Sequence, residues 1–402
     1  MHSMPDFSSL MKDKFYAEKL LLLKLCSFYI SREARSNIEN LVASVKDWQM
    51  LSRMAKTNGI AALVYKNSNA LNMHTFDKSC KEALLLEAHN ITFRNTLKIL
   101  AMKELFAVFE KENIDFILLK GYQFIRKYYQ DLDLRDIGDL DVLIVPESFE
   151  KAVQFMEKYP YRLVNRPYEH HKMYISKTYN VQVELHKDVI SPPSCFHYTL
   201  NEFFQNTVIF RDNEISAKVL NDRYELYLQL MNALYSHAFY PFKARTIVDI
   251  QAVLLSLGDA ADWRKIIAHA QSMGAFNYLL ISARTCNDFF NWPMPAIFHQ
   301  HVYRKSFEKK YQHFLSFLFH YMEYIQDLKH RKNPALLQIL IADTFMNSVR
   351  LFYHYLFLPE KYLRYSRKDL NIPVFLFYLI RLFLLPFRFA YKTIYSYLRS
   401  RK

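Results

Sequence analysis

Two aspartates, Asp139 and Asp141, stand one residue apart at the start of the apolar segment DLDVLIV, residues 139–145. Side chains alternate between the two faces of a strand, so a strand here places both carboxylates on one face. Like charges on one face repel each other, and divalent cations such as Mg²⁺ relieve that repulsion because they bind carboxylate oxygens. The segment therefore predicts a strand that begins with a metal-binding pair of carboxylates.

A third carboxylate stands in the segment VQVELHKD, residues 181–188. Its alternation places Glu184 and His186 on one face, opposite the apolar Val183 and Leu185. Metal-dependent phosphoryl transfer uses two ions about 3.5–4 Å apart, which clamp the attacking and leaving oxygens. If this strand lies beside the first, we expect Glu184 to complete the acidic face.

The rest of the chain predicts a small α/β unit between helical regions. IDFILLKG, residues 114–121, is typical of a buried strand, and residues 172–189 are typical of a hairpin with its break at Asn180. Apolar residues at helical spacing dominate both ends of the chain. We therefore expect an α+β fold with an N-terminal helical region, an α/β core, a C-terminal helical region and a helical tail. Their predicted bounds are residues 1–95, 96–200, 201–330 and 331–402.

The net charge of +14 is concentrated in the tail, where residues 361–402 carry ten basic residues and one acidic residue. In a helix over residues 372–402, basic residues spaced by 4 and 7 share one face, and apolar residues fill the rest. This pattern predicts either peripheral contact with the inner face of a membrane or packing on the protein body. Because the remaining chain is only weakly basic, the charge disfavours nucleic acid as a partner.

The four cysteines, Cys26, Cys80, Cys195 and Cys286, lie far apart and form no C-x-x-C pair. This spacing indicates neither a disulfide framework nor a zinc site, and it favours a reducing compartment. The first residues lack the pattern of a secretory signal, and the apolar runs are too short or too interrupted to span a bilayer. We therefore expect a cytoplasmic location.

Three segments together resemble the nucleotidyltransferases of the DNA polymerase β-like superfamily, and within it an uncharacterised nucleotidyltransferase family. They are LLKGYQFIRKYY at 118–129, LRDIGDLDVLIV at 134–145 and VQVELHKD at 181–188. The helical segments DWQMLSRMAKTNGIAALVY at 47–65 and SHAFYPFKARTIVDIQAVL at 236–254 are similar to other parts of the family pattern. The resemblance implies a polymerase-β-like sheet core and transfer of a nucleoside monophosphate from an NTP to a hydroxyl or phosphate acceptor, with release of pyrophosphate. The acceptor, whether a small molecule, a glycan precursor or a protein, stays open.

The resemblance also implies residue roles. Asp139, Asp141 and Glu184 are the expected catalytic carboxylates and ligands of two Mg²⁺ ions, with Mn²⁺ as an alternative metal. Four further residues are the expected nucleotide-binding residues: Lys120, Gly121, Arg135 and Gly138. The first phosphate-binding motif departs from the superfamily, since Lys120-Gly121 stands where Gly-Gly or Gly-Ser is usual.

Structural alternatives remain for several of these residues. Lys120 is also compatible with an ordinary strand end, Arg135 with an ion pair to Asp133 or Asp136, and His186 with either a substrate contact or core packing. His170 and His171 lack the helical spacing of a zinc motif, which disfavours a metal role. His237 and Asp249 are more typical of a core histidine and a surface acid than of an acceptor pocket. The rival function is a non-catalytic, membrane-peripheral scaffold or binding protein that keeps the same fold.

Overall fold

The structure is a computed structural model that describes residues 10–71, 75–164, 171–190, 194–235, 243–324 and 334–357. Within these residues, no helix is long and apolar enough to cross a membrane. His170, His237 and the tail segment 372–402 lie outside the described residues.

One seven-stranded mixed sheet forms the α/β part, in the order β3-β4-β5-β2-β1-β7-β6. The central strand β2 is antiparallel to β1 and parallel to β5, while β1 is parallel to β7. The remaining neighbours, β3 with β4, β4 with β5 and β6 with β7, are antiparallel. The strands are β1 (Phe116–Leu119), β2 (Leu140–Ile144), β3 (Tyr161–Val164), β4 (His171–Ser176), β5 (Gln182–His186), β6 (Thr207–Arg211) and β7 (Ser216–Leu220).

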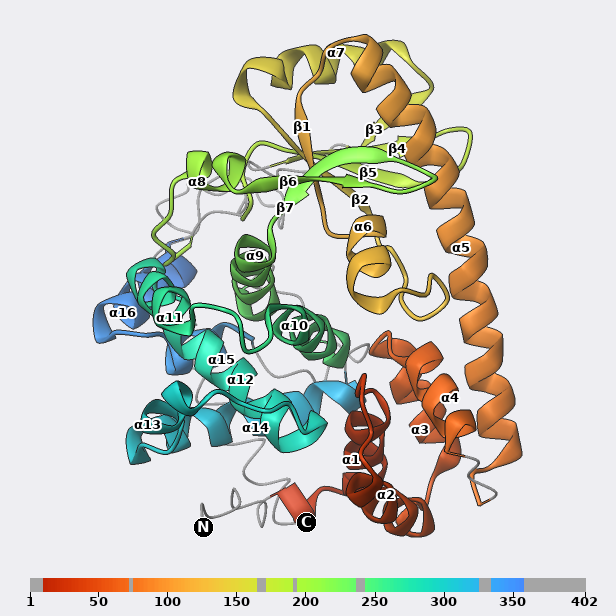
Figure 1. Cartoon of the computed structure of the whole chain (residues 1–402), viewed down its shortest axis with the longest axis vertical. Helices are drawn as coiled ribbons and strands as arrows, with labels where there is room; N and C mark the ends of the chain where they lie inside the picture. Colours follow the sequence, from red (N-terminus) through yellow and green to blue (C-terminus); the bar gives the residue numbers. More distant parts are fainter. Residues whose placement is uncertain are drawn as a thin grey trace, which may run out of the picture.

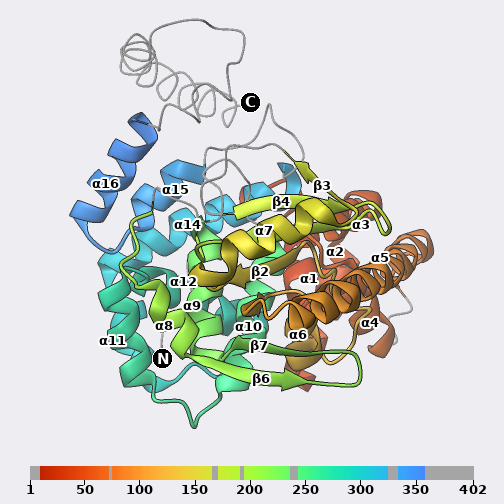
Figure 2. The same ribbon diagram turned by 90° about the horizontal axis from the view of Figure 1, so that it is seen from above.

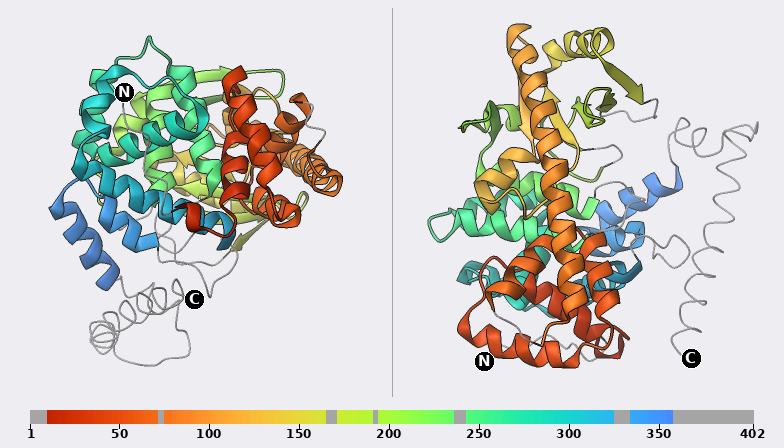
Figure 3. Two further views of the ribbon diagram at one scale, coloured as in Figure 1. Left: turned by 90° about the horizontal axis from the view of Figure 1, so that it is seen from below. Right: turned by 90° about the vertical axis from the view of Figure 1, so that its right-hand side faces the viewer.

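The N-terminal helices form the opposite end of the molecule from the sheet, and α5 connects the two (Figure 1). The C-terminal half of α5 packs Phe106 and Phe109 against Phe116 of β1, and Phe109 also contacts Phe155 of α7. The right-hand view of Figure 3 shows α5 running from these helices to the sheet. The helices are α1 (Tyr16–Leu25), α2 (Arg32–Ser44), α3 (Trp48–Thr57), α4 (Ala61–Ala70) and α5 (Lys78–Lys111).

The later helices lie on both sides of the sheet and at the helical end of the molecule. In Figures 1 and 2, α7 lies over one side of the sheet, and α9 and α10 lie on the other side. Between β1 and β2, the chain forms the short α6 and a π-helical turn. The bounds are α6 (Tyr122–Phe124), the π-helical turn (Ile125–Tyr129), α7 (Phe149–Lys158), α8 (Leu200–Gln205), α9 (Asp222–Tyr235), α10 (Ala244–Leu257), α11 (Trp263–Met273), α12 (Phe276–Phe290), α13 (His299–Val302), α14 (Lys305–Tyr324), α15 (Pro334–Ile341) and α16 (Phe345–Leu356).

The α+β class predicted from the sequence is confirmed, as are the strand at 116–119 and the hairpin of β4 and β5. Two expectations about extent were wrong. The chain does not become purely helical after residue 200, because β6 and β7 add an edge to the sheet beside β1. Residue 95 also marks no boundary, since α5 runs unbroken through it from Lys78 to Lys111. The alternation that reveals a half-buried strand is weak in β6, whose side chains are all partly or fully exposed.

Candidate functional site

Pairing of β2 with β5 brings two of the three carboxylates together. Asp141 of β2 stands directly opposite Glu184 of β5, and Asp139 lies just before β2. Leu140 and Val142 are buried, so the acids and the apolar residues alternate across the strand. The strand that carries Glu184 therefore lies beside the strand that carries Asp141.

His186 lies between Asp141 and Glu184. Its Nε2 is 2.9 Å from Oδ1 of Asp141 and 3.4 Å from Oε2 of Glu184. One histidine nitrogen is therefore close to both carboxylates. Burial disfavours a charge on His186, but hydrogen bonds to Asp141 and Glu184 outweigh it and raise its pKa to about 9. In return, the His186 charge overcomes the effect of burial on Glu184 and lowers the pKa of that carboxyl.

Asp139 is exposed at the edge of this group. Partial removal from water raises its pKa, and the neighbouring charges of Asp141 and Glu184 raise it further, to about 7. The charges of both other carboxylates therefore act on Asp139. Among the described residues, Asp139 has no direct hydrogen-bonding partner of its own. The three acids form one electrostatic unit, and a cation placed among them relieves their repulsion.

The loop that leads into β2 is fixed by Asn95 of α5. Its Nδ2 donates to the carbonyl oxygens of Leu132, at 2.7 Å, and Arg135, at 2.9 Å. Its Oδ1 accepts a 2.9 Å hydrogen bond from the backbone N–H of Ile137. Because Asn95 is fully buried, these bonds fix the loop against α5 and thereby position the start of β2.

Asp136 ties the same loop to α5 through a second group of contacts. Its carboxylate accepts hydrogen bonds from Nε of Arg94, at 2.7 Å, from Nζ of Lys98, and from the backbone N–H of Gly138, at 2.8 Å. Burial opposes the charge on Asp136, but Lys98 and the other donors hold the pKa of that carboxyl well below its usual range. Asp136 is thus a structural acid, neutralised by its own cations.

The two glycines among the predicted nucleotide-binding residues stand at positions that favour glycine for different reasons. Gly121 has φ +76° and lies so close to Ile137 that a Cβ would meet the Ile137 Cγ2 atom at 3.3 Å. Gly138 has φ +79°, but a Cβ there would meet open space. Gly121 allows two loops to approach each other, whereas Gly138 supplies a backbone conformation that favours glycine and leaves room beside Asp139.

A cavity of about 730 Å³ opens beside Asp139, within the size range of small-molecule sites. Its lining includes five basic side chains, from the N-terminal helices, from α5 and from the start of α10: Lys56, Arg94, Lys98, Lys243 and Arg245. Acidic side chains line it too, but Asp136 and Glu87 already pair with Arg94.

Lys243 and Arg245 differ from the other cations of this cavity, because neither has an ion-pair partner among the described residues. Burial and the nearby Arg245 charge lower the pKa of Lys243. Burial and the nearby Arg135 charge likewise lower the pKa of Arg245. Two cations without ion-pair partners among the described residues give this part of the cavity a positive potential suited to an anion. Sequence reasoning did not single out these two residues, although they lie in the KARTIVD stretch of a segment that resembles the family.

Arg135 lies in a buried ion pair with Asp249 of α10. Its Nε and Nη2 donate to the two carboxylate oxygens at 2.8 and 3.0 Å, and the hydroxyl of Tyr129 donates to Oδ1 at 2.7 Å. Each charged side chain is only 5% exposed. The expected partners of Arg135, Asp133 and Asp136, were therefore wrong, and so was the interpretation of Asp249 as a surface acid. The bidentate bond uses the donors that a phosphate contact would need.

Lys120, the remaining expected phosphate ligand, directly follows β1 and has φ +52°. Its charge lies near the buried Glu225 of α9, where burial raises the pKa of the carboxyl and Lys120 opposes that rise. The structure thus brings Lys120 to the same end of the sheet as Asp141, since Leu119 pairs with Asp141 across β1 and β2.

His171 reaches the acidic group through strand pairing. It is the first residue of β4 and stands opposite His186 of β5, with the two ring centroids 5.1 Å apart. Its Nε2 lies 3.6 Å from Oε2 of Glu184. His171 therefore lies close to a carboxylate although the sequence lacks a helical metal-binding motif. The hairpin of β4 and β5 brings it there by strand pairing.

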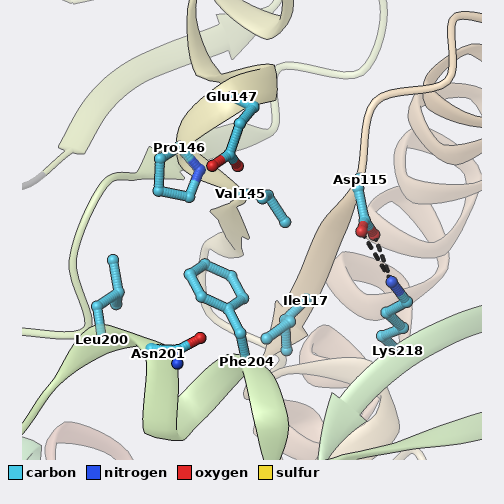
Figure 4. Close-up of a pocket in the computed structure, with 9 residues that line it drawn as sticks. All are labelled: Asp115, Ile117, Val145, Pro146, Glu147, Leu200, Asn201, Phe204 and Lys218. Carbon is cyan, nitrogen blue, oxygen red and sulfur yellow. Dashed lines mark hydrogen bonds and ion pairs between the residues drawn. The ribbon is translucent and has the colours of Figure 1, made fainter.

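A second cavity, of about 310 Å³, lies at the opposite end of β1 and β2 (Figure 4). Asp115 and Lys218 form an ion pair there, with Nζ 2.8 Å from each carboxylate oxygen. Phe204 and Ile117 contribute apolar surface to it. It contains none of the predicted site residues, so the acidic group and the larger cavity define the candidate site.

A family model described as "Uncharacterised nucleotidyltransferase" matches residues 44–291, which include the acidic group, the loop before β2 and every residue that lines the larger cavity. A search of curated proteins gives no match. Since the matched segment covers more than half of the chain, the protein belongs to this uncharacterised nucleotidyltransferase family.

Proposed function

We propose that this protein transfers a nucleoside monophosphate from an NTP to a hydroxyl or phosphate acceptor, in a reaction that depends on Mg²⁺. The observation that carries the proposal is the pairing of Asp141 with Glu184, next to Asp139, beside a cavity whose lining includes two cations, Lys243 and Arg245, without ion-pair partners among the described residues. Acidic and basic groups of this kind are what a metal-bound triphosphate requires on its two sides.

The donor set fits the metal. Asp139, Asp141 and Glu184 offer carboxylate oxygens, the ligands that Mg²⁺ prefers, and their mutual repulsion raises the pKa of Asp139. When bound, a pair of Mg²⁺ ions would supply charge stabilisation at the α-phosphate and at the leaving pyrophosphate. Mn²⁺ prefers the same oxygen ligands and is the alternative metal.

The cavity supports binding of the triphosphate. Lys243 and Arg245 carry the charges that no carboxylate neutralises among the described residues, so we assign to them the phosphate oxygens furthest from Asp139. Gly138, Gly121 and Lys120 lie on the loops that frame the acidic group, and they remain our proposed backbone and side-chain contacts. For Arg135 we propose an indirect part, in which its bond to Asp249 anchors the loop against α10.

The transfer step needs no reactant other than the NTP and the acceptor. An acceptor oxygen attacks the α-phosphorus, the bond to the bridging oxygen of the pyrophosphate breaks, and pyrophosphate leaves with its electron pair. The proton of a hydroxyl acceptor passes to a carboxylate of the group, for which Glu184 is the proposed base. His186 holds Asp141 and Glu184 in place, and we propose it as a contact for the acceptor.

Calorimetric titration of each NTP with Mg²⁺ into the full chain tests the proposal. We expect one NTP to bind, with binding lost in the Asp139→Ala, Asp141→Ala double variant. The matched control is an Asp115→Ala, Glu147→Ala double variant, which removes two acids at the opposite end of the same strands. Absence of binding by every NTP to folded wild-type protein would refute the proposal.

One observation favours peripheral membrane contact as an addition to catalysis. Helix α16 exposes a contiguous apolar face, made by Phe345, Met346, Val349, Phe352 and Tyr353. The chain continues from this helix into the strongly basic segment 361–402. Apolar side chains beside basic ones favour an anionic lipid surface. We expect sedimentation with anionic but not zwitterionic vesicles, weakened in a Phe345→Ser, Phe352→Ser variant; equal sedimentation of wild type and variant would remove this role from α16.

A further inference from the structure

Two histidines and one carboxylate converge on a point beside the acidic group. His171 comes from β4, while Glu184 and His186 come from the neighbouring β5. One ligand atom from each of these three residues lies within 4.8 Å of the other two. All three side chains are buried, with His171 4% exposed, so the strand pairing fixes this arrangement.

The spacing matches a small, tightly bound ion. Ligands at about 2.0–2.1 Å from a tetrahedral metal lie about 3.3 Å from each other. Oε2 of Glu184 is 3.4 Å from Nε2 of His186 and 3.6 Å from Nε2 of His171. A fourth donor is at hand, since Oδ1 of Asp141 is 2.9 Å from the same His186 nitrogen.

Glu184 is oriented for this contact by its own strand. Its other oxygen, Oε1, accepts a 2.8 Å hydrogen bond from Nε2 of Gln182, which leaves Oε2 facing the two histidines. Hydrogen bonds that orient a ligand in this way are a regular feature of metal sites.

The chemistry of the donors selects the ion. Imidazole nitrogen suits Zn²⁺ and other first-row transition metals, whereas Mg²⁺ requires near-octahedral oxygen and keeps several waters. Two imidazoles and one carboxylate close together, with a second carboxylate beside them, therefore favour Zn²⁺ over Mg²⁺.

We propose that His171, His186 and Glu184, with Asp141 as the fourth ligand, bind a divalent transition-metal ion, for which Zn²⁺ is the best match. Binding of this ion needs no nucleotide. Asp141 and Glu184 also belong to the proposed Mg²⁺ site, so their sharing between the two metal positions rests on the proposed function. The active site would then hold one transition-metal ion beside the Mg²⁺ that accompanies the NTP.

Titration of Co²⁺ into chelator-treated full-length protein tests the site directly, because tetrahedral Co²⁺ has an intense visible absorption. We expect one Co²⁺ per chain, displaced by Zn²⁺ but not by a large excess of Mg²⁺. His171→Gln should weaken Co²⁺ binding on the order of 100-fold, at least the loss seen when a supporting residue of a metal site is removed. The control, His301→Gln, changes a histidine on α13 and should leave Co²⁺ binding unchanged.

Each result separates this proposal from the proposed function. Asp139→Asn should abolish Mg²⁺-dependent NTP binding and retain the Co²⁺ spectrum, because Asp139 is not a ligand of the transition metal. If Co²⁺ fails to bind, binds equally to folded His171→Gln, or is displaced by Mg²⁺ at similar concentration, the transition-metal site is overturned while NTP binding still stands. Circular dichroism of each variant shows whether it is folded, and Glu184→Gln provides a second ligand variant should His171→Gln unfold.

Discussion

The two ends of the strand pair β1–β2 carry acids in opposite circumstances. At one end, Asp115 meets Lys218 across the sheet, both are about half exposed, and the ion pair neutralises the carboxylate (Figure 4). At the other end, burial and the charges of Asp141 and Glu184 raise the pKa of Asp139, while His186 is the partner that Asp141 and Glu184 share. One end of this strand pair therefore holds a neutralised surface acid, and the other holds an acid, Asp139, without an ion-pair partner among the described residues.

This difference shows where the folded scaffold holds charged groups in a locally unfavourable arrangement. The charged Asp115 carboxylate needs no support from the rest of the scaffold, because water and Lys218 both favour it. The acidic end persists because Asn95, Asp136 and the Arg135–Asp249 pair fix the loop before β2 from two sides. A repulsive arrangement that the scaffold enforces is typical of a functional site.

The largest difference between the two ends should appear in ligand binding. We expect Asp141→Asn to lower Mg²⁺-dependent NTP affinity on the order of 1,000-fold, about 4 kcal/mol, because a direct metal ligand is lost. The same change should alter thermal stability little, since the removed charge both repels Asp139 and pairs with His186. Calorimetry and thermal unfolding measure the two effects, with Asp115→Asn as the control. A large loss of stability in Asp141→Asn would show that the acids are structural.

The buried ion pair that supports the acidic end should control stability. Asp249→Ala leaves the Arg135 charge buried without its partner, so we expect a loss of about 3–5 kcal/mol in the free energy of unfolding. The Arg135→Met, Asp249→Leu double variant should regain part of that loss, because neither charge of the pair remains buried alone, while the Tyr129 hydroxyl still loses its acceptor. Urea unfolding measures both. A loss below about 1 kcal/mol in Asp249→Ala would mean that the pair does not anchor the loop.

Lys243 offers a sharper test of the cavity beside the acidic end. Lys243→Ala should weaken NTP binding about tenfold, roughly 1.4 kcal/mol, by removing one contact to phosphate. Stability should not fall, because its ammonium has no carboxylate partner among the described residues and burial lowers its pKa. Lys218→Ala, at the other end, is the matched control, and equal NTP affinity for both variants would exclude Lys243 from the nucleotide site.

The smallest effect is expected at the Asp115 end. An exposed ion pair contributes about 0.2–1 kcal/mol, so a double-mutant cycle of Asp115→Ala and Lys218→Ala should give a coupling energy in that range, decreasing with added salt. Neither variant should change NTP binding. A coupling above about 2 kcal/mol is expected of a buried ion pair and would contradict the exposed position of this one.

The sequence was a good guide wherever the information was local. Alternation fixed the face of Asp139 and Asp141 relative to Leu140, and a break at Asn180 fixed the hairpin of β4 and β5. It was a poor guide to partners far along the chain. Arg135 pairs with a residue of α10, 114 positions away, and no local pattern could predict that. The exposed strand β6 was missed because its side chains lack alternation.

Sequence alone determined the α+β class, the acidic motif and its strand, because alternation of side chains is a property of the backbone that holds in any sheet. Tertiary structure decided which residues share the site. Only the order β4-β5-β2-β1 brings His171, Glu184 and Asp141 together, and only the packing of α5 and α10 against the loop places Lys243 and Arg245 in one cavity with Asp139. The physical reason is that strand order and helix packing are set by burial of the whole core, which no single segment encodes.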